Sequence, residues 1–266
     1  MTNNSFILGK RILRIFLPNK KKYLFYKQLS YKEQSLTEGE MEFFRHIKGD
    51  LKIMIDVGPR TDTYYAENSE NLFIHYFEPN PYFCRILSKK LSTGSRDFKL
   101  NNIGLSDKEE QLYYYHDSQS FLEISAVKNK SYARSKNKIE LKTLNSFNFE
   151  NIDFLKIDTE EFDYFVLKGA TELLTKIKYL QFELGLAKID NHKRLTNQDY
   201  FDLLNPNFDL YILRDENNPI WKANIEKRLL LKLEGDLFRI LIMLQSLGIG
   251  FNIVGINKNL KKIPNL

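Results

Sequence analysis

The sequence predicts an α/β fold in which a mostly parallel sheet is flanked by helices. Three observations indicate this fold. Short apolar runs alternate with longer segments of helical periodicity along most of the chain. Several of the apolar runs end in an acidic residue or a glycine. The composition, with 42% hydrophobic and 14% aromatic residues, is sufficient for a sizeable core and argues against a disordered chain.

The length of 266 residues fits one large domain with a small appendage. We expect a basic helical extension over residues 1–50 and a main domain over 51–266, with an insertion at about 111–144. The first 30 residues contain seven of the 40 basic residues and no acidic residue, so they account for the net charge of +6. A nucleic-acid-binding protein more often carries its basic stripe on the main domain, so we expect no nucleic-acid partner.

The N-terminal segment has two interpretations. Residues 6–16 read FILGKRILRIF, an apolar run interrupted by cations, which is unlike a signal peptide. Residues 1–30 either rest as a basic amphipathic helix on an anionic membrane face, or pack an apolar side on the domain and leave the cations in water. No run approaches the roughly 18 apolar residues that cross a bilayer. A single cysteine fits a reducing compartment, so we expect a cytoplasmic protein, either free or peripheral to the inner membrane face.

The apolar runs define the expected strands of the sheet, which are residues 51–57, 72–77, 98–103, 152–157, 179–182, 208–213 and 251–256. Helical spacing follows the second run through residues 81–91 and follows the fourth run from Phe162 to Leu173. A longer helical stretch is expected from about residue 225 to 247. The insertion is less regular, and its runs LYYY and IELKTL fit short strands on the substrate side.

Chemically useful side chains follow successive expected strands, where an open α/β sheet binds its ligands. They are Asp56 and Gly58 after the first strand, Glu78 after the second, Ser106 and Asp107 after the third, Asp158 and Glu160 after the fourth, and Glu183 after the fifth. Neighbouring parallel strands lie about 4.8 Å apart, so these residues converge on one crevice. The sequence therefore predicts an acidic pocket at this edge of the sheet.

The spacing within this pocket favours a nucleoside-containing cofactor. Glu78 lies 20 residues after Gly58, and a carboxylate at the end of the second strand can accept hydrogen bonds from ribose hydroxyls. The turn from Gly58 to Asp62 reads GPRTD, which is neither GxGxxG nor a P-loop, so a pyrophosphate cradle is poorly supported. S-adenosylmethionine lacks phosphates and carries an ammonium and a sulfonium, which carboxylates stabilise.

A series of motifs resembles those of the FkbM family of methyltransferases. The resemblance covers about residues 50 to 257. Its motifs are IDVG at 55–58, YFEPNP at 76–81, NNIGLSDKE at 101–109, LKTLNS at 141–146, FLKIDTEEFDYFVLKGA at 154–170 and YLQFELG at 179–185. The resemblance implies a Rossmann-like class I methyltransferase fold with a seven-stranded sheet. It also implies S-adenosylmethionine as the donor and usually O-methylation of a hydroxyl on a sugar, glycan or other natural product.

The resemblance assigns a set of cofactor-binding residues, which are Asp56, Gly58, Glu78, Asn102, Ser106, Asp107 and Asp158. Within this set Glu78 matches the carboxylate that binds the ribose, and Asp107 matches the acid beside the adenine. Two positions depart from the family pattern, because Asp62 and Glu161 stand where the family usually has glycine. A side chain at either place is expected to crowd the cofactor or to require a different backbone conformation.

The resemblance also points to candidate catalytic residues. A base that takes the hydroxyl proton of the acceptor accelerates methyl transfer, and we hypothesise that Asp158 or Glu160 is that base and that Glu183 lines the acceptor site. We expect no metal, because these acids have a simpler role as cofactor partners. The alternative is a non-catalytic relative that has lost cofactor binding and serves as a glycan-binding or assembly subunit. A nicotinamide-dependent oxidoreductase is disfavoured, because the glycine fingerprint is absent.

Overall fold

A computed structural model describes residues 36–93, 96–116, 135–159, 162–184, 195–215, 228–234, 241 and 250–260. The chain divides into two compact units, Met1–Leu36 and Thr37–Leu266, and only the second is described below. The expected basic helix within residues 1–30 lies outside the described residues, and so does Glu160.

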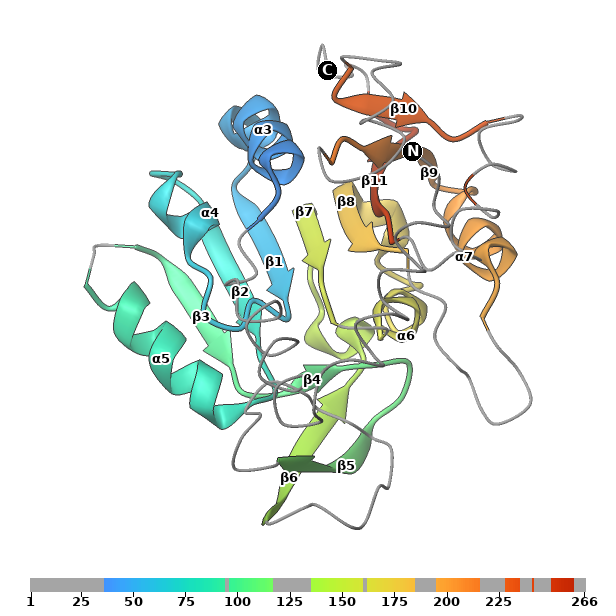
Figure 1. Cartoon of the computed structure of the whole chain (residues 1–266). Coiled ribbons are helices and arrows are strands. Elements are labelled where there is room, and N and C mark those ends of the chain that lie inside the picture. The colour runs from blue at the N-terminus through green and yellow to red at the C-terminus, as the bar shows by residue number, and fades with distance from the viewer. Residues whose placement is uncertain are drawn as a thin grey trace, which may run out of the picture. The chain divides into compact units, whose positions relative to one another are not determined.

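The larger unit is built on an eight-stranded sheet in the order β10-β9-β11-β8-β7-β1-β2-β3 (Figure 1). Its strands are β1 (Ile53–Val57), β2 (Phe73–Phe77), β3 (Phe98–Asn101), β7 (Ile152–Ile157), β8 (Ile177–Glu183), β9 (Phe208–Leu213), β10 (Leu230–Lys232) and β11 (Asn252–Asn257). The strands from β3 to β8 pair in parallel, whereas β11 lies antiparallel between β8 and β9. The mostly parallel sheet and each of its expected strands are confirmed.

The eighth strand is a correction to the sequence analysis, which expected a helix from about residue 225 to 247. Leu230–Lys232 instead forms β10 and pairs antiparallel with β9 at the edge of the sheet. Leu229 and Leu230 are buried there. The spacing of the leucines favours a helix, but the backbone hydrogen bonds to β9 and the burial of the leucines favour a strand. Tertiary contacts override local propensity here.

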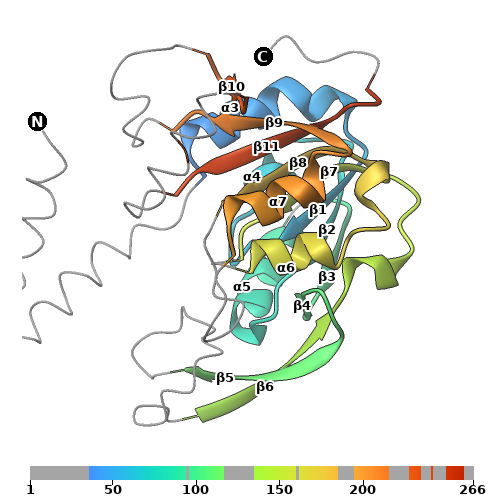
Figure 2. The ribbon, with the colours of Figure 1, turned by 90° about the vertical axis from the view of Figure 1, so that its right-hand side faces the viewer.

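Helices cover both faces of the sheet, and Figure 2 shows α6 and α7 in front of it with α4 and α5 behind. The described helices are α3 (Glu38–Ile47), α4 (Tyr64–Glu67), α5 (Pro81–Leu91), α6 (Asp163–Lys168) and α7 (Asn197–Leu204), with short 3-10 turns at Lys48–Asp50, Leu144–Phe147 and Leu174–Lys176. The expected helix over 81–91 is confirmed. Within the described ranges, every helix is too short or too polar to span a membrane.

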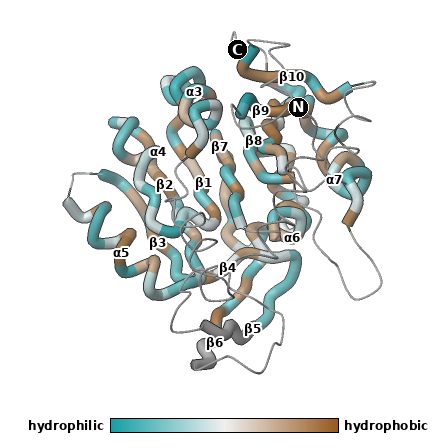
Figure 3. The backbone as a smooth tube through the Cα atoms, in the orientation of Figure 1, coloured by the Kyte–Doolittle hydropathy of each residue, from teal (hydrophilic) through white to brown (hydrophobic). Residues whose placement is uncertain are grey.

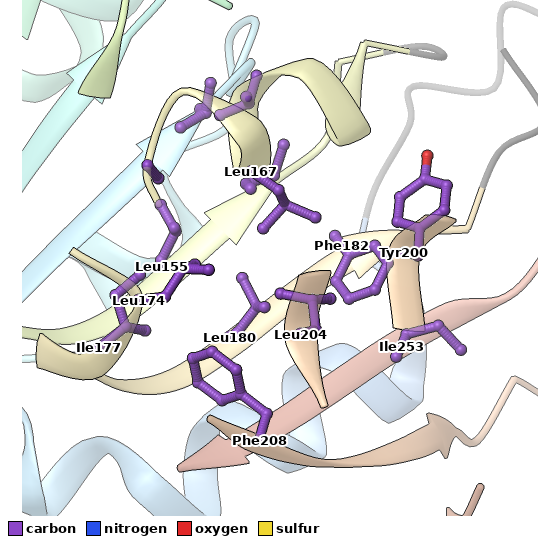
Figure 4. Close-up of a cluster of buried hydrophobic side chains, with 14 of the residues drawn as sticks. Leu155, Leu167, Leu174, Ile177, Leu180, Phe182, Tyr200, Leu204, Phe208 and Ile253 are labelled. Carbon is purple, nitrogen blue, oxygen red and sulfur yellow. The ribbon is translucent and has the colours of Figure 1, made fainter. Parts of the chain in front are cut away.

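The face beneath α6 and α7 holds the main apolar core (Figure 4). Alternate residues of β7 and β8, including Leu155, Leu180 and Phe182, point to this face and pack against Leu167 of α6 and Leu204 of α7. The tube in Figure 3 carries brown, hydrophobic segments along these central strands. Burying large side chains completely in this way is the main source of stability for such a sheet.

Helix α3 packs on the opposite face of the sheet. A capping box at its start joins the side chains of Thr37 and Glu40 to each other's backbone. Phe43 contacts Phe154 of β7 and Tyr179 of β8 edge-on, with ring centroids 6.0 and 6.1 Å apart. The compact unit therefore begins at Thr37, earlier than the boundary at residue 51 expected from the sequence.

The insertion forms a second, three-stranded sheet in the order β4-β6-β5. Its strands are β4 (Gly104–Leu105), β5 (Glu110–His116) and β6 (Ser135–Lys142), so the two expected strands are present. A Cβ on Gly104 would lie 3.4 Å from Pro79, which follows β2. The small sheet therefore starts beside the carboxyl end of a central strand, on the edge where the candidate site lies.

Candidate functional site

The loops after β1 and β7 meet at Gly58. This residue has a φ of +77°, which favours glycine. A Cβ at Gly58 would lie 2.0 Å from the carbonyl oxygen of Asp158. The amide of Gly58 donates to the carbonyl of Phe77 at 2.9 Å, and that of Asp158 donates to the carbonyl of Val57 at 3.0 Å. Glycine is therefore required for the ends of β1, β2 and β7 to come this close.

Glu78 is held at the end of β2 by two backbone donors. Its Oε1 accepts from the amide of Asn80 at 2.8 Å and its Oε2 from the amide of Arg60 at 3.0 Å. Burial raises the pKa of this carboxyl to about 7, although the two amide donors lower it. Each carboxylate oxygen keeps a second lone pair, so the group can also accept hydrogen bonds from two adjacent hydroxyls.

Asn102, the residue after β3, hydrogen-bonds to this loop. Its side-chain amide donates to the carbonyls of Glu78 at 2.9 Å and of Pro79 at 3.2 Å. Asn102 therefore acts on the backbone that carries the Glu78 carboxylate.

Asp56 and Asp158 flank a buried lysine that the sequence analysis did not identify. The ammonium of Lys156 lies 3.2 Å from Oδ2 of Asp158 and 3.8 Å from Oδ1 of Asp56. Asp56 and Lys156 are buried, whereas the side chain of Asp158 is 41% exposed. Burial raises the pKa of Asp56 to about 7 even though Lys156 lowers it. Burial also opposes the charge on Lys156, but Asp158, Asp56 and Glu40 outweigh it and hold the lysine pKa above its ordinary value.

The loop after β7 is tied to the end of β8 by Asp163, another residue that the sequence analysis missed. Oδ2 of Asp163 accepts from the hydroxyl of Thr159 at 2.9 Å and from its amide at 3.3 Å, and Oδ1 accepts from the amide of Glu183 at 3.1 Å. Burial, aided by the charge of Asp158, raises the pKa of Asp163 to about 6. The exposed Glu183 is thus positioned relative to this loop through its backbone.

Ser106 and Asp107 lie against the end of α6. The amide of Ser106 donates to the carbonyl of Lys142 at 2.9 Å, and a Cβ on Gly169 would lie 2.0 Å from the carbonyl oxygen of Ser106. The carboxylate of Asp107 pairs with the ammonium of Lys168 at 2.8 Å. The charge of Asp107 is therefore already matched by a cation, and the contacts of Ser106 and Asp107 lie at the end of α6.

Asp62 occupies the first position at which the family usually has glycine. Its Oδ1 accepts from the amide of Tyr64 at 2.7 Å, which starts α4. Within the described ranges, the non-glycine residues with positive φ are Arg60 and Asn148, so the left-handed position in this turn belongs to Arg60. The backbone at Asp62 does not require glycine. The second departure, Glu161, lies outside the described residues.

The structure thus brings Asp56, Gly58, Glu78 and Asp158 together at the carboxyl ends of three adjacent strands. This set fits S-adenosylmethionine. Glu78 would hold the ribose, and Asp56 and Asp158 would face a positively charged ligand. The buried Oδ1 of Asp56 lies 3.8 Å from the ammonium of Lys156 and has no hydrogen-bond partner in the described part of the chain, so it can still accept a hydrogen bond from a ligand or water.

A sequence comparison identifies the family directly. The model of the family described as "Methyltransferase FkbM domain" matches residues 53–205, which is more than half of the chain. The match includes every expected site residue from Asp56 to Glu183. No curated protein matches the chain.

Solved structures with a similar fold are distant. A methyltransferase FkbM from Methylobacillus flagellatus KT is 15% identical with a TM-score of 0.41, over 61% of this chain and only 40% of its own length. The N-terminal domain of EvdMO1 with SAH bound is 10% identical with a TM-score of 0.43, over 85% of this chain and 82% of that one. A putative methyltransferase from Streptococcus mutans in complex with SAH is 8% identical with a TM-score of 0.44, over 84% and 99%.

Proposed function

The chain belongs to the FkbM methyltransferase family and uses S-adenosylmethionine, and from this premise we propose that it methylates a hydroxyl oxygen of a sugar, a glycan or another natural product. The observation that carries the proposal is the position of Asp158. Its carboxylate is 41% exposed and is held by Lys156 beside the fully buried Asp56, at the edge that bears Glu78. An accessible acid at this place is suited to meet an acceptor hydroxyl.

When bound, S-adenosylmethionine supplies an electrophilic methyl group on a positively charged sulfur and leaves as the neutral thioether. The chain has two tasks in the transfer. It holds the acceptor oxygen in line with the methyl group, which supplies much of the rate. It also takes the proton that the hydroxyl loses, which contributes about 10²- to 10⁴-fold.

We assign the proton-accepting role to Asp158 or Glu160, with Glu183 lining the acceptor site. Asp158→Asn and Glu160→Gln separate the two candidates. The base variant is expected to lose at least about 100-fold in kcat while S-adenosylmethionine affinity stays within a few-fold of wild type. Undiminished turnover in both variants would contradict the assignment.

The small sheet of β4, β5 and β6 begins beside Pro79 on the same edge as the acids, so we place the acceptor on this side of the site. The test is a methyl-transfer screen against sugars, nucleotide sugars and other hydroxyl compounds, read as a mass gain of one methylene unit. We expect a product whose new methyl group is on oxygen. Methylation on nitrogen or carbon only would overturn the oxygen assignment. Cofactor binding without transfer to any acceptor would favour the non-catalytic alternative.

We also propose that the basic residues 1–30 bring the enzyme to an anionic membrane face, where lipid-linked acceptors are found. The support is the sequence, because seven cations and no acid accompany an apolar run. Flotation with anionic vesicles is expected to recover the full-length protein and not a version that lacks residues 1–30. Equal recovery of the two proteins would contradict membrane binding through residues 1–30.

A further inference from the structure

One row of side chains crosses four strands of the large sheet on the face that α3 covers. Asp56 of β1 is in register with Tyr76 of β2 on one side and with Lys156 of β7 on the other. Lys156 is in register with Gln181 of β8. All four are buried, although a lysine, an aspartate and a glutamine are residue types that a sheet interior normally excludes.

Helix α3 places a second carboxylate over this row. Glu40 is only 7% exposed, and its Oε1 accepts from the side-chain amide of Gln181 at 2.6 Å. Its Oε2 accepts from the amide of Thr37 at 2.8 Å, so the capping box fixes its orientation. Glu40 lies before residue 53, outside the part of the chain that matches the family. The row and Glu40 therefore form one buried polar layer that links α3 to Asp56.

Several charged and titratable groups face Asp56 within this layer. Lys156 of β7 provides the cation, and the acids are Asp158 after β7, Asp62 after β1 and Glu40 of α3. The phenols of Tyr65 and Tyr76 complete the surroundings, and their hydroxyls, like Oδ1 of Asp56, have no hydrogen-bond partner in the described residues. Charges this deeply buried interact far more strongly than charges in water.

We propose that Glu40 and Lys156 are positioning residues that control the ionisation of Asp56 in opposite directions, and that they thereby control how strongly the site favours a cationic cofactor. The inference rests on S-adenosylmethionine being that cofactor. Neither residue needs to touch the cofactor, because each acts through Asp56. Burial, as the largest cause, raises the pKa of Asp56 to about 7. Lys156 lowers this pKa, and Asp62, Asp158 and Glu40 raise it, with Glu40 the smallest of the three.

Two substitutions separate this role from a merely structural one. Glu40→Gln removes a negative charge. The substituted amide can still accept from Thr37, and its NH₂ can donate to Oε1 of Gln181 once the Gln181 amide turns over, since that oxygen has no partner within the described residues. Lys156→Met removes the positive charge with little change in side-chain volume. Glu42→Gln is the matched control, because Glu42 lies on the same helix but pairs with Arg214.

The first measurement follows the carboxyl signal of Asp56 by ¹³C NMR in the full, cofactor-free protein, with the signal assigned by its loss in Asp56→Asn. We expect the midpoint of its titration to fall in Glu40→Gln and to rise by a larger amount in Lys156→Met, because Lys156 acts on Asp56 more strongly than Glu40 does. Glu42→Gln is expected to titrate as wild type. Glu40→Gln is decisive by itself if Lys156→Met does not fold.

The second measurement is the ratio of the affinities for S-adenosylmethionine and S-adenosylhomocysteine between pH 5.5 and 8.5. The two ligands differ by one methyl group and the positive charge that it places on sulfur, and they share the ribose, so the ratio cancels the contribution of Glu78 to ribose binding. We expect the pH midpoint of the ratio to move with the Asp56 midpoint in each variant. An Asp56 titration that is unchanged in Glu40→Gln, or a ratio that does not follow it, would overturn the inference. Failure of the wild type to bind either ligand would overturn the cofactor assignment itself.

Discussion

The two faces of the large sheet differ in what they bury. The face under α6 and α7 is lined by aliphatic and aromatic side chains such as Leu155, Leu180 and Phe182 (Figure 4). The face under α3 is apolar away from the site, but near the carboxyl edge it buries Asp56 and Lys156. Buried charges are expensive and are commonly found where a protein needs perturbed chemistry. The comparison indicates that the apolar face stabilises the fold, whereas the face under α3 both stabilises the fold and sets the charges of the site.

The largest expected effect is on the charged face. Lys156→Met leaves Asp56 and Asp158 without their cation, and we expect it to cost about 3 to 5 kcal/mol of unfolding free energy at pH 8. Asp56 has a raised pKa, so its ionisation weakens the folded state as the pH rises through about 7, and Lys156 offsets that loss. The deficit of the variant should therefore shrink towards pH 6. Urea unfolding of wild type and variant at several pH values measures this loss of unfolding free energy. A loss that is independent of pH would contradict the claim that the face under α3 differs from the apolar face by its charges.

The apolar face should respond differently. Leu180 is fully buried in the main core, and Leu180→Ala is expected to cost about 3 kcal/mol through lost burial and a cavity. No titratable group is involved, so the same urea series should give the same loss from pH 6 to pH 8. A loss that grows with pH would show that the two faces are electrostatically coupled.

Asp163 tests the junction between the loop after β7 and the end of β8. Asp163→Asn keeps one acceptor oxygen where two carboxylate oxygens receive three hydrogen bonds, and we expect a loss of about 2 kcal/mol in unfolding free energy. Because Asp163 holds the loop that carries Asp158, kcat should fall more than the affinity for S-adenosylmethionine. Asp202→Asn, on the exposed side of α7, is the control and should change neither quantity.

The smallest effect is expected at the surface pair of Lys168 and Asp107. The lysine side chain is 52% exposed, so Lys168→Met should cost less than about 1 kcal/mol of unfolding free energy, after allowance for screening by solvent. Thermal unfolding at low and at 1 M salt measures this cost, and high salt should remove most of it. A cost above 2 kcal/mol would mean that Asp107 is more deeply coupled to the site than its contacts indicate.

Much of the fold could be predicted because the central strands are continuous apolar runs with clear ends. Residues 152–157 and 208–213 were predicted at their observed bounds. The edge strand Leu230–Lys232 could not be predicted in the same way, because its leucines also fit a helix and only the pairing with β9 decides between them.

Site residues at or just after the carboxyl end of a strand could be predicted from the sequence. Residues buried between the sheet and α3 were harder to predict. Asp56, Glu78 and Asp158 follow from their positions, whereas Glu40 depends on its contact with Gln181, far away in the sequence. One signal for Lys156 was present, because a lysine inside the apolar run IDFLKI of a central strand requires a buried partner. Asp158, two residues later in the chain, is one partner, and the pairing of β1 with β7 adds Asp56 as the buried one.

The most direct test of the central claim is a calorimetric titration of S-adenosylmethionine into wild-type protein and Glu78→Gln. The substitution removes the negative charge and turns an amide NH₂ towards one of the two backbone donors that hold Glu78. We predict saturable binding by the wild type and at least tenfold weaker binding by Glu78→Gln, with Glu172→Gln as an exposed control equal to wild type. Wild-type protein that does not bind, or a Glu78→Gln variant that binds as tightly, would contradict the claim that these acids form the cofactor site.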